Sequence, residues 1–155
     1  MANTTKTIEN NTVRLHRVFS APPEKLYRAF LDADAMAQWI PPEGFTAKVH
    51  HMDVRVGGTF RMTFTNFTTG NGHSFGGEYL ELVPNKRLRY TDKFDDPNLP
   101  GIMQVTVDLT AVVVGTELTI EQAGIPSVIP LAACYLGWQQ SLQNLARLVV
   151  PNITP

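Results

Sequence analysis

Two hydrophobic periods follow one another in this chain, and together they restrict its fold more than any other feature. Between residues 45 and 120, short stretches alternate apolar with polar residues, as Phe60, Met62 and Phe64 do with their neighbours. A period of two is typical of strands with one buried face. From Leu131 to Val149 the steps become four and three, which is the stripe of an amphipathic helix. We therefore expect an antiparallel sheet whose apolar face is covered by one long C-terminal helix.

Residues that favour turns separate the expected strands. They predict about six strands connected as a meander, in addition to an earlier strand at Val13–Phe19. The long helix is expected from about Ser127 to the residue before Pro151, because proline cannot continue a helix. The clusters of turn residues lie at 55–58, 68–72, 84–86, 95–101 and 114–115.

Two short helices are expected between the first strand and the meander. A proline pair ends the first strand, and the helix that follows has its N-cap near Ser20 or Ala21. Asp32 is suited to cap a second short helix, which ends at Trp39 because another proline pair follows. The resulting fold class is α+β of the helix-grip type, with a curved antiparallel sheet of six to seven strands around the long helix.

Length and composition narrow the range of functions. A chain of 155 residues suits one domain, and we expect a flexible N-terminal segment at residues 1–12 followed by a single domain at 13–150. The formal net charge of −1, with 17% charged residues, provides no field to attract nucleic acid or anionic lipid. No apolar run is long enough to span a membrane, and the first residues do not form a signal peptide. The single cysteine, Cys134, is expected to be a small buried side chain on the long helix. Because one cysteine forms no internal disulfide, a reducing compartment is suggested, and we expect a cytoplasmic location.

Several segments, in this order and spacing, resemble a known family. The chain resembles the START-like superfamily, also called SRPBCC or polyketide-cyclase-like, and within it the AHSA-like family, named for the activator of the heat-shock protein 90 ATPase. The resemblance runs over about residues 13–149. It implies a pocket between the long helix and the sheet, but no single function, because the superfamily includes carriers, receptors and enzymes. The matching segments are 21–30, Trp39, 53–58, 77–84, 115–119 and 137–138.

Bulky side chains are concentrated where the sheet is expected to face the long helix. Such residues also fill ordinary cores, and periodicity does not separate a filled core from a lined cavity. The resemblance favours a cavity for a small hydrophobic or aromatic ligand, with tyrosine hydroxyls and a tryptophan N–H to orient it. His73 or Arg61 would add one charge at the rim. The candidates are Trp39, Met52, Met62, Phe64, Phe75, Tyr79, Tyr90, Phe94, Met103, Tyr135 and Trp138.

Other motifs favour structural roles. The glycine pair at 57–58 precedes a strand and not a helix, which indicates a hairpin turn with positive φ and not a phosphate cradle. His50 and His51 are adjacent on an expected strand and point to opposite faces, which argues against a metal site with His73. We expect no metal and no cofactor.

The sequence contains no recognisable catalytic constellation. Glu121 is expected beside the cavity mouth, and the loop at 96–101 is expected at its rim. Most other carboxylates of the sheet are expected to face water, because acidic residues are seldom buried. These are Glu78, Glu81, Asp92, Asp95 and Asp96.

Two alternatives from other functional classes remain open. The cavity would also suit a cyclase or a hydrolase-like enzyme in which a Tyr, His or Glu moves protons. The family's name suggests a module that docks on a chaperone. Homodimerisation through a sheet edge or a helix face is a further expectation.

Overall fold

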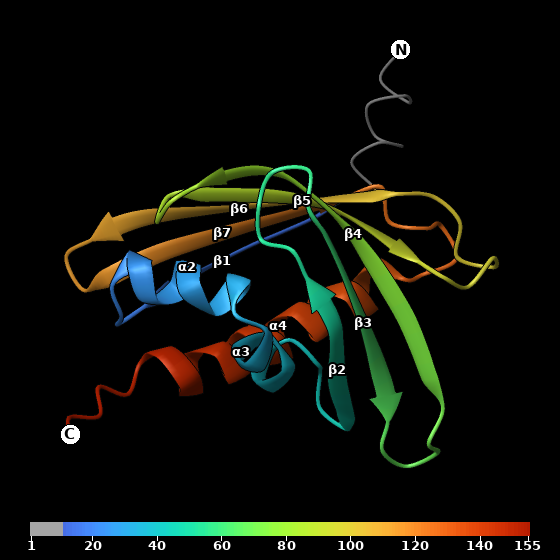
Figure 1. The fold of residues 1–155 in the computed structure, drawn as a ribbon, viewed down its shortest axis with the longest axis horizontal. Coiled ribbons are helices and arrows are strands. Elements are labelled where there is room, and N and C mark those ends of the chain that lie inside the picture. Colours follow the sequence, from blue (N-terminus) through green and yellow to red (C-terminus); the bar gives the residue numbers. More distant parts are fainter. Residues whose placement is uncertain (1–10) are drawn as a thin grey trace.

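A seven-stranded antiparallel sheet curls around the C-terminal helix in the computed structural model, which describes residues 11–155 (Figure 1). The strand order is β1-β7-β6-β5-β4-β3-β2, so β2 to β7 form the meander and β1 joins it beside β7. The predicted α+β helix-grip class is confirmed. In chain order the elements are β1 (Val13–Phe19), α2 (Pro23–Leu31), α3 (Ala33–Trp39), β2 (Phe45–Met52), β3 (Thr59–Asn66), β4 (Gly72–Val83), β5 (Arg87–Phe94), β6 (Met103–Val112), β7 (Gly115–Ala123) and α4 (Leu131–Val149).

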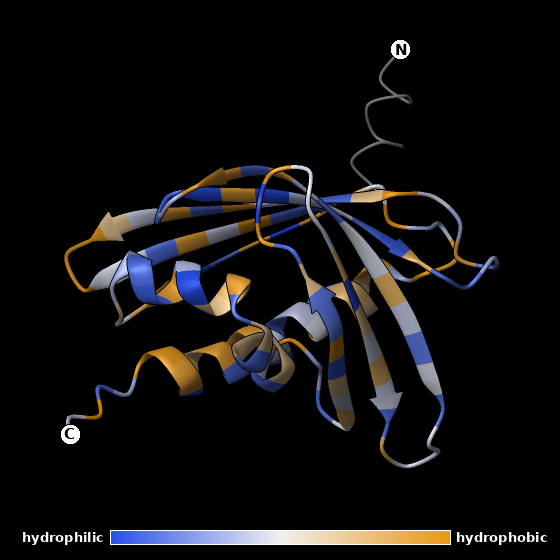
Figure 2. Cartoon of the chain, in the orientation of Figure 1, coloured by the Kyte–Doolittle hydropathy of each residue, from blue (hydrophilic) through white to orange (hydrophobic). Residues whose placement is uncertain are grey.

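The strands alternate between a buried and a wetter face, as their sequence requires. In β6 the side chains of Met103, Val105, Val107 and Leu109 are buried, whereas those between them are more exposed. The alternation of apolar and polar residues is visible along the strands in Figure 2. All three helices lie on the concave side of the sheet (Figure 1), where α2 contacts β6 and α3 contacts β2. None of the helices within residues 11–155 is long and apolar enough to cross a membrane.

The two short helices begin and end close to the predicted residues. Asp32 caps α3 by accepting a hydrogen bond from the backbone N–H of Ala35 at 2.9 Å. The N-cap of α2, predicted near Ser20 or Ala21, is the next residue, Pro22, whose carbonyl accepts from Lys25 N at 3.1 Å. A proline follows at the first helical position, where the missing N–H costs nothing.

Helix α4 begins four residues later than predicted, at Leu131 and not Ser127. Pro130 is the reason: a proline disfavours helical backbone in the residue before it, and this restricts Ile129. Residues 126–129 instead form a turn in which Ile129 N donates to Pro126 O at 3.0 Å. The predicted N-terminal segment, residues 1–12, lies almost entirely outside the described residues.

The turn between β2 and β3 contains the glycine pair noted in the sequence. Gly57 has a φ of +86°, as predicted, and its N–H donates to Tyr79 O at 2.9 Å. A Cβ at Gly58 would lie 2.0 Å from Asp53 O. The glycines therefore allow this turn to dock on β4, with the N–H of Gly57 engaged by that strand.

Strand β4 carries a second glycine pair where the sheet curves. A Cβ at Gly77 would lie 1.7 Å from the carbonyl oxygen of Thr91, on the neighbouring strand β5. Its φ is not positive. The glycine is therefore required by the close approach of two backbones and not by its own dihedral angles.

We predict opposite effects of one methyl group at two glycines. Gly77→Ala should lower the free energy of unfolding by about 3 kcal/mol, because the methyl group overlaps β5. Gly137→Ala in α4 should raise it by about 0.5–1 kcal/mol, because alanine is the better helix former and its Cβ would meet no atom within 4 Å. Urea unfolding followed by circular dichroism measures both, and equal effects at the two sites would contradict this explanation of the curvature.

Candidate functional site

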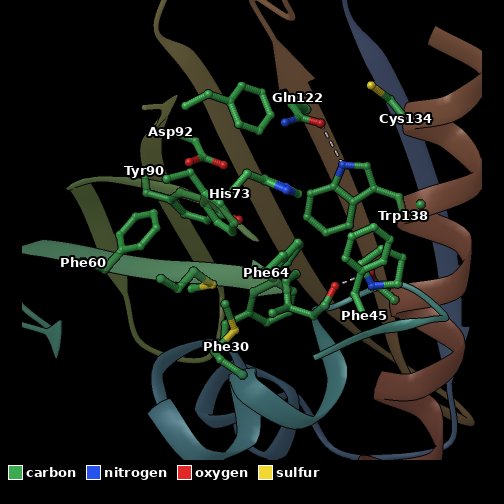
Figure 3. A pocket seen from close by; sticks show the side chains of 18 of the residues that line it. Phe30, Phe45, Phe60, Phe64, His73, Tyr90, Asp92, Gln122, Cys134 and Trp138 are labelled. Atoms are coloured by element: carbon green, nitrogen blue, oxygen red, sulfur yellow. Dashed lines mark hydrogen bonds between the residues drawn. The ribbon is translucent and has the colours of Figure 1, made fainter. Parts of the chain in front are cut away.

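A cavity of about 480 Å³ lies between the concave face of the sheet and α4 (Figure 3). Volumes of this size are typical of sites for small organic ligands. Most of the lining side chains are apolar or aromatic, and they come from β2 to β5, β7 and all three helices. The lining residues His73 and Ala133 are exposed to solvent, so the cavity meets the outside between the start of β4 and the first turn of α4.

Eight of the eleven predicted candidates line this cavity, and three lie elsewhere. The three are Trp39, Met103 and Tyr135. Whether the eight bind a ligand stays a prediction. They are Met52, Met62, Phe64, Phe75, Tyr79, Tyr90, Phe94 and Trp138.

Trp39 lies behind the wall of the cavity and not on it. It is fully buried, and its Nε1 donates to the carbonyl oxygen of Ala29 at 2.9 Å. Its ring packs edge-on against Phe30, with centroids 4.8 Å apart. Because Phe30 does line the cavity, Trp39 supports the wall indirectly.

Met103 and Tyr135 belong to a second, smaller apolar cluster. Met103 packs with Val13 and Ile125 near the end of the sheet. Tyr135 packs against the same cluster, and its hydroxyl accepts a hydrogen bond from Arg14 N at 3.3 Å. Tyr135 lies three positions before the lining residue Trp138, but its side chain packs toward Val13 and Arg14 and not into the cavity.

The face of α4 that borders the cavity is built from small side chains. Cys134, Gly137 and Ser141 line the cavity at helical spacing, with Trp138 beside them. Nothing lies within 4 Å of the position that a Cβ of Gly137 would take. Further along the same helix Leu142 and Leu145 are buried. The helix thus closes the core at its C-terminal half and leaves space at its N-terminal half.

Aromatic rings form much of the wall on the sheet side. Phe60 contacts Tyr79 and Tyr90 with ring centroids 5.6 and 5.5 Å apart. Nearer the exposed end, Phe64 packs edge-on against Phe75 at 4.8 Å. Phe60 was absent from the candidates although it shares the alternation of Met62 and Phe64, which was the signal that could have found it.

Gln122 is a polar lining residue that the sequence analysis missed. Its side-chain oxygen accepts a hydrogen bond from Trp138 Nε1 at 2.9 Å, which ties β7 to α4 across the cavity wall (Figure 3). Its amide nitrogen donates to Met103 Sδ at 3.3 Å. Because both of these groups are engaged, the tryptophan N–H expected to orient a ligand is already used within the protein.

The charged side chains expected at the cavity rim, Arg61 and Glu121, do not line the cavity. Arg61 forms an ion pair with Asp95, and neither residue lines the cavity. Glu121 pairs with Arg14 at 2.8 Å and also lies outside the lining, as does the loop at 96–101. These expectations are wrong because the side chains of Arg61 and Glu121 alternate with inward-facing neighbours, which turns them to the convex face. His73 does line the cavity, but burial lowers the pKa of its imidazole and favours the neutral form.

Asp92 lines the cavity, so the expectation that it faces water is wrong. On β5 it continues the inward-facing series of Leu88 and Tyr90. The residue as a whole is part-buried, but its carboxyl group is surrounded by protein. Within residues 11–155 its Oδ1 atom has no hydrogen-bond partner. Burial raises the pKa of Asp92 to about 7, against a smaller lowering by a hydrogen bond from the backbone of Lys93.

The remaining titratable groups of the cavity are held in their neutral forms. Burial raises the pKa of Tyr79 to about 12, with a further contribution from the negative charge of Asp53. Burial also raises the pKa of Tyr90, more strongly, and that of the Cys134 thiol. Cys134 is part-buried and lines the cavity, and is not a fully buried side chain as predicted. Its protonated thiol is a poor nucleophile.

The fold and the cavity define the class: an antiparallel sheet that grips a long helix around an internal apolar space. The sequence matches the family described as "Activator of Hsp90 ATPase homolog 1-like protein" over residues 20–150. The chain belongs to this family, as its resemblance predicted. No curated protein matches the chain.

Solved structures have the same fold. A Chromobacterium violaceum protein is 59% identical, with a TM-score of 0.91, over 92% of this chain and 99% of that one. A Mesorhizobium loti protein is 30% identical, with a TM-score of 0.67, over 88% and 95% of the two chains. An AHSA1 protein from Silicibacter pomeroyi, 21% identical with a TM-score of 0.77 over 88% and 96%, shares the fold.

The raised pKa of Asp92 predicts a specific dependence of stability on pH. Because the folded-state pKa of about 7 exceeds the ordinary value of 3.8, the folded protein binds the extra proton. The stability from this proton is complete below about pH 4 and is lost as the pH rises through about 7. From about pH 5 to about pH 8, the wild type should lose on the order of 2–3 kcal/mol relative to Asp92→Asn.

Urea unfolding at the two pH values measures this difference. Asp108→Asn is the matched control, since Asp108 lies outside the cavity, 3.6 Å from the guanidinium of Arg87. A pH-independent difference between wild type and Asp92→Asn would contradict the raised pKa.

Proposed function

We propose that the protein binds a small hydrophobic or aromatic molecule in the cavity between the sheet and α4. The observation that carries this proposal is the apolar cavity of about 480 Å³ with a few convergent polar groups. Such cavities are the usual form of small-molecule sites. Transfer of apolar ligand surface from water into it would contribute about 25 cal/mol per Å².

The alternative of an ordinary filled core is less consistent with the packing. Protein interiors are packed at the density of organic crystals, and their voids are seldom larger than a water molecule. Apart from Trp138, the side chains of α4 that line the space are small, while aromatic rings face them from the sheet. Large rings opposite small residues leave a space of defined shape, which supports recognition of a flat ligand.

The two alternatives from other classes have weaker support. An enzyme using the same cavity would employ Asp92 or His73 for proton transfer, because these are titratable groups that line it. The family's description supports contact with a chaperone. Ligand binding is preferred because it needs only the cavity, whereas an enzyme also needs a catalytic group and a docking module also needs a partner surface. A cytoplasmic location, homodimerisation and a single domain at 13–150 are part of the same proposal.

Calorimetric titration with 1-naphthalenemethanol, a neutral aromatic probe, tests the proposal. Wild type should bind one probe molecule per chain. Gly137→Leu should abolish binding, because the new side chain extends from α4 into the cavity. The same variant should be at least as stable as wild type, since leucine is a better helix former than glycine by nearly 1 kcal/mol.

Gln139→Leu is the matched control. Residue 139 is exposed on the same helix and does not line the cavity, so this variant should bind the probe as wild type does. Equal binding by wild type and Gly137→Leu would place the probe elsewhere and overturn the proposal, and so would a wild type that does not bind.

A further inference from the structure

Within the part of the chain that the structure describes, the cavity lining contains an acidic side chain but no basic lysine or arginine to balance it. Asp92 is the one carboxyl group among the lining residues drawn from positions 11–155, and no lysine or arginine is among them. Its Oδ1 atom is buried and has no hydrogen-bond partner within the same residues. A buried carboxyl group with an unpaired oxygen is costly, and its place in the cavity lining favours a ligand that compensates its charge.

Aromatic groups surround this carboxyl group. Tyr90 and Phe94 precede and follow it on the inward face of β5, and Tyr79 pairs with Tyr90 across the sheet. Figure 3 shows Asp92 beside Tyr90, on the wall of the space that His73 also enters. Aromatic faces attract cations through their quadrupoles, and more strongly away from water.

We propose that the ligand of this cavity carries a protonated amine, which Asp92 binds as an ion pair within the aromatic wall. The inference rests on the proposed function and names the chemical class of its ligand: an arylalkylamine or a similar organic cation. The apolar part of the ligand packs against the rings near Phe64, and the ammonium group pairs with the carboxylate of Asp92.

Competing ligand classes fit the site less well. An anionic ligand would place a second negative charge beside Asp92, with no cationic side chain in the lining to offset it. A neutral alcohol would supply a hydrogen bond without compensating the charge. A charge-assisted hydrogen bond is about twice as strong as a neutral one, so the amine is favoured over an alcohol of the same shape.

Binding of the cation depends on the ionised form of Asp92. In the free protein the pKa of Asp92 is raised to about 7, so at lower pH the carboxyl group must release its proton to solvent before it pairs with the ammonium group. The other titratable lining groups are His73, Tyr79, Tyr90 and Cys134. The pKa of His73 is lowered, and those of the other three are raised. They therefore add little charge near neutral pH.

Three probes of matched shape test the proposal: 1-naphthylmethylamine, 1-naphthalenemethanol and 1-naphthoic acid. Titration calorimetry of wild type at about pH 8 should give an amine affinity about tenfold above that of the alcohol, and an acid affinity below both. For Asp92→Asn the ratio of amine to alcohol affinity should fall below about twofold. Asp108→Asn, which removes a carboxylate outside the cavity, should retain the wild-type ratio.

The wild type alone supplies a second test if Asp92→Asn does not fold. Lowering the pH from about 8 to about 6 should reduce the ratio of amine to alcohol affinity severalfold, because Asp92 becomes protonated. A wild type that binds the alcohol at least as tightly as the amine overturns the inference and leaves the proposed function in place. A wild type that binds none of the three probes overturns both.

Discussion

The packing of α4 against the concave sheet determines the rest of this structure. At its C-terminal half, Leu142, Leu145 and Val149 are buried against the sheet and α2 in the larger hydrophobic cluster. At its N-terminal half the same face presents Cys134 and Gly137, which leave a cavity of about 480 Å³. One helix therefore supplies both the hydrophobic anchor of the fold and the open wall of its site, and the change of side-chain size between the two halves separates these roles.

The sheet must curve to meet that helix, and its sequence allows this at few places. Gly77 lets β4 approach the backbone of β5 more closely than any other residue would. The strand pairing shifts by one residue between Tyr79 and Glu81 and again between Val49 and His51. Such irregularities increase local bending and twist. The curvature turns the inward faces of β3, β4 and β5 toward a common space and so makes the aromatic wall.

The hydrophobic periods predicted the fold well, because strand and helix periods are direct consequences of one-sided burial. They could not predict which apolar cluster a residue joins. Met103 and Tyr135 have the size and polarity of cavity residues, but they pack in the second cluster beside Val13. Asp92 was misplaced for a different reason: its charge and the nearby loop suggested solvent, whereas its alternation with Tyr90 already assigned it to the inward face. The alternation of side chains along β5, and not the charge of the residue, determines which face Asp92 lies on.

Methyl NMR of methionine residues tests most directly whether a ligand occupies the cavity. Met36, Met52 and Met62 line it, whereas Met103 lies in the second cluster. With methionine methyl groups labelled and 1-naphthalenemethanol added, the account predicts shifted signals and intermolecular nuclear Overhauser effects for the three lining methionines, with Met103 little changed. Probe contacts confined to Met103, or to none of the four, would contradict the account.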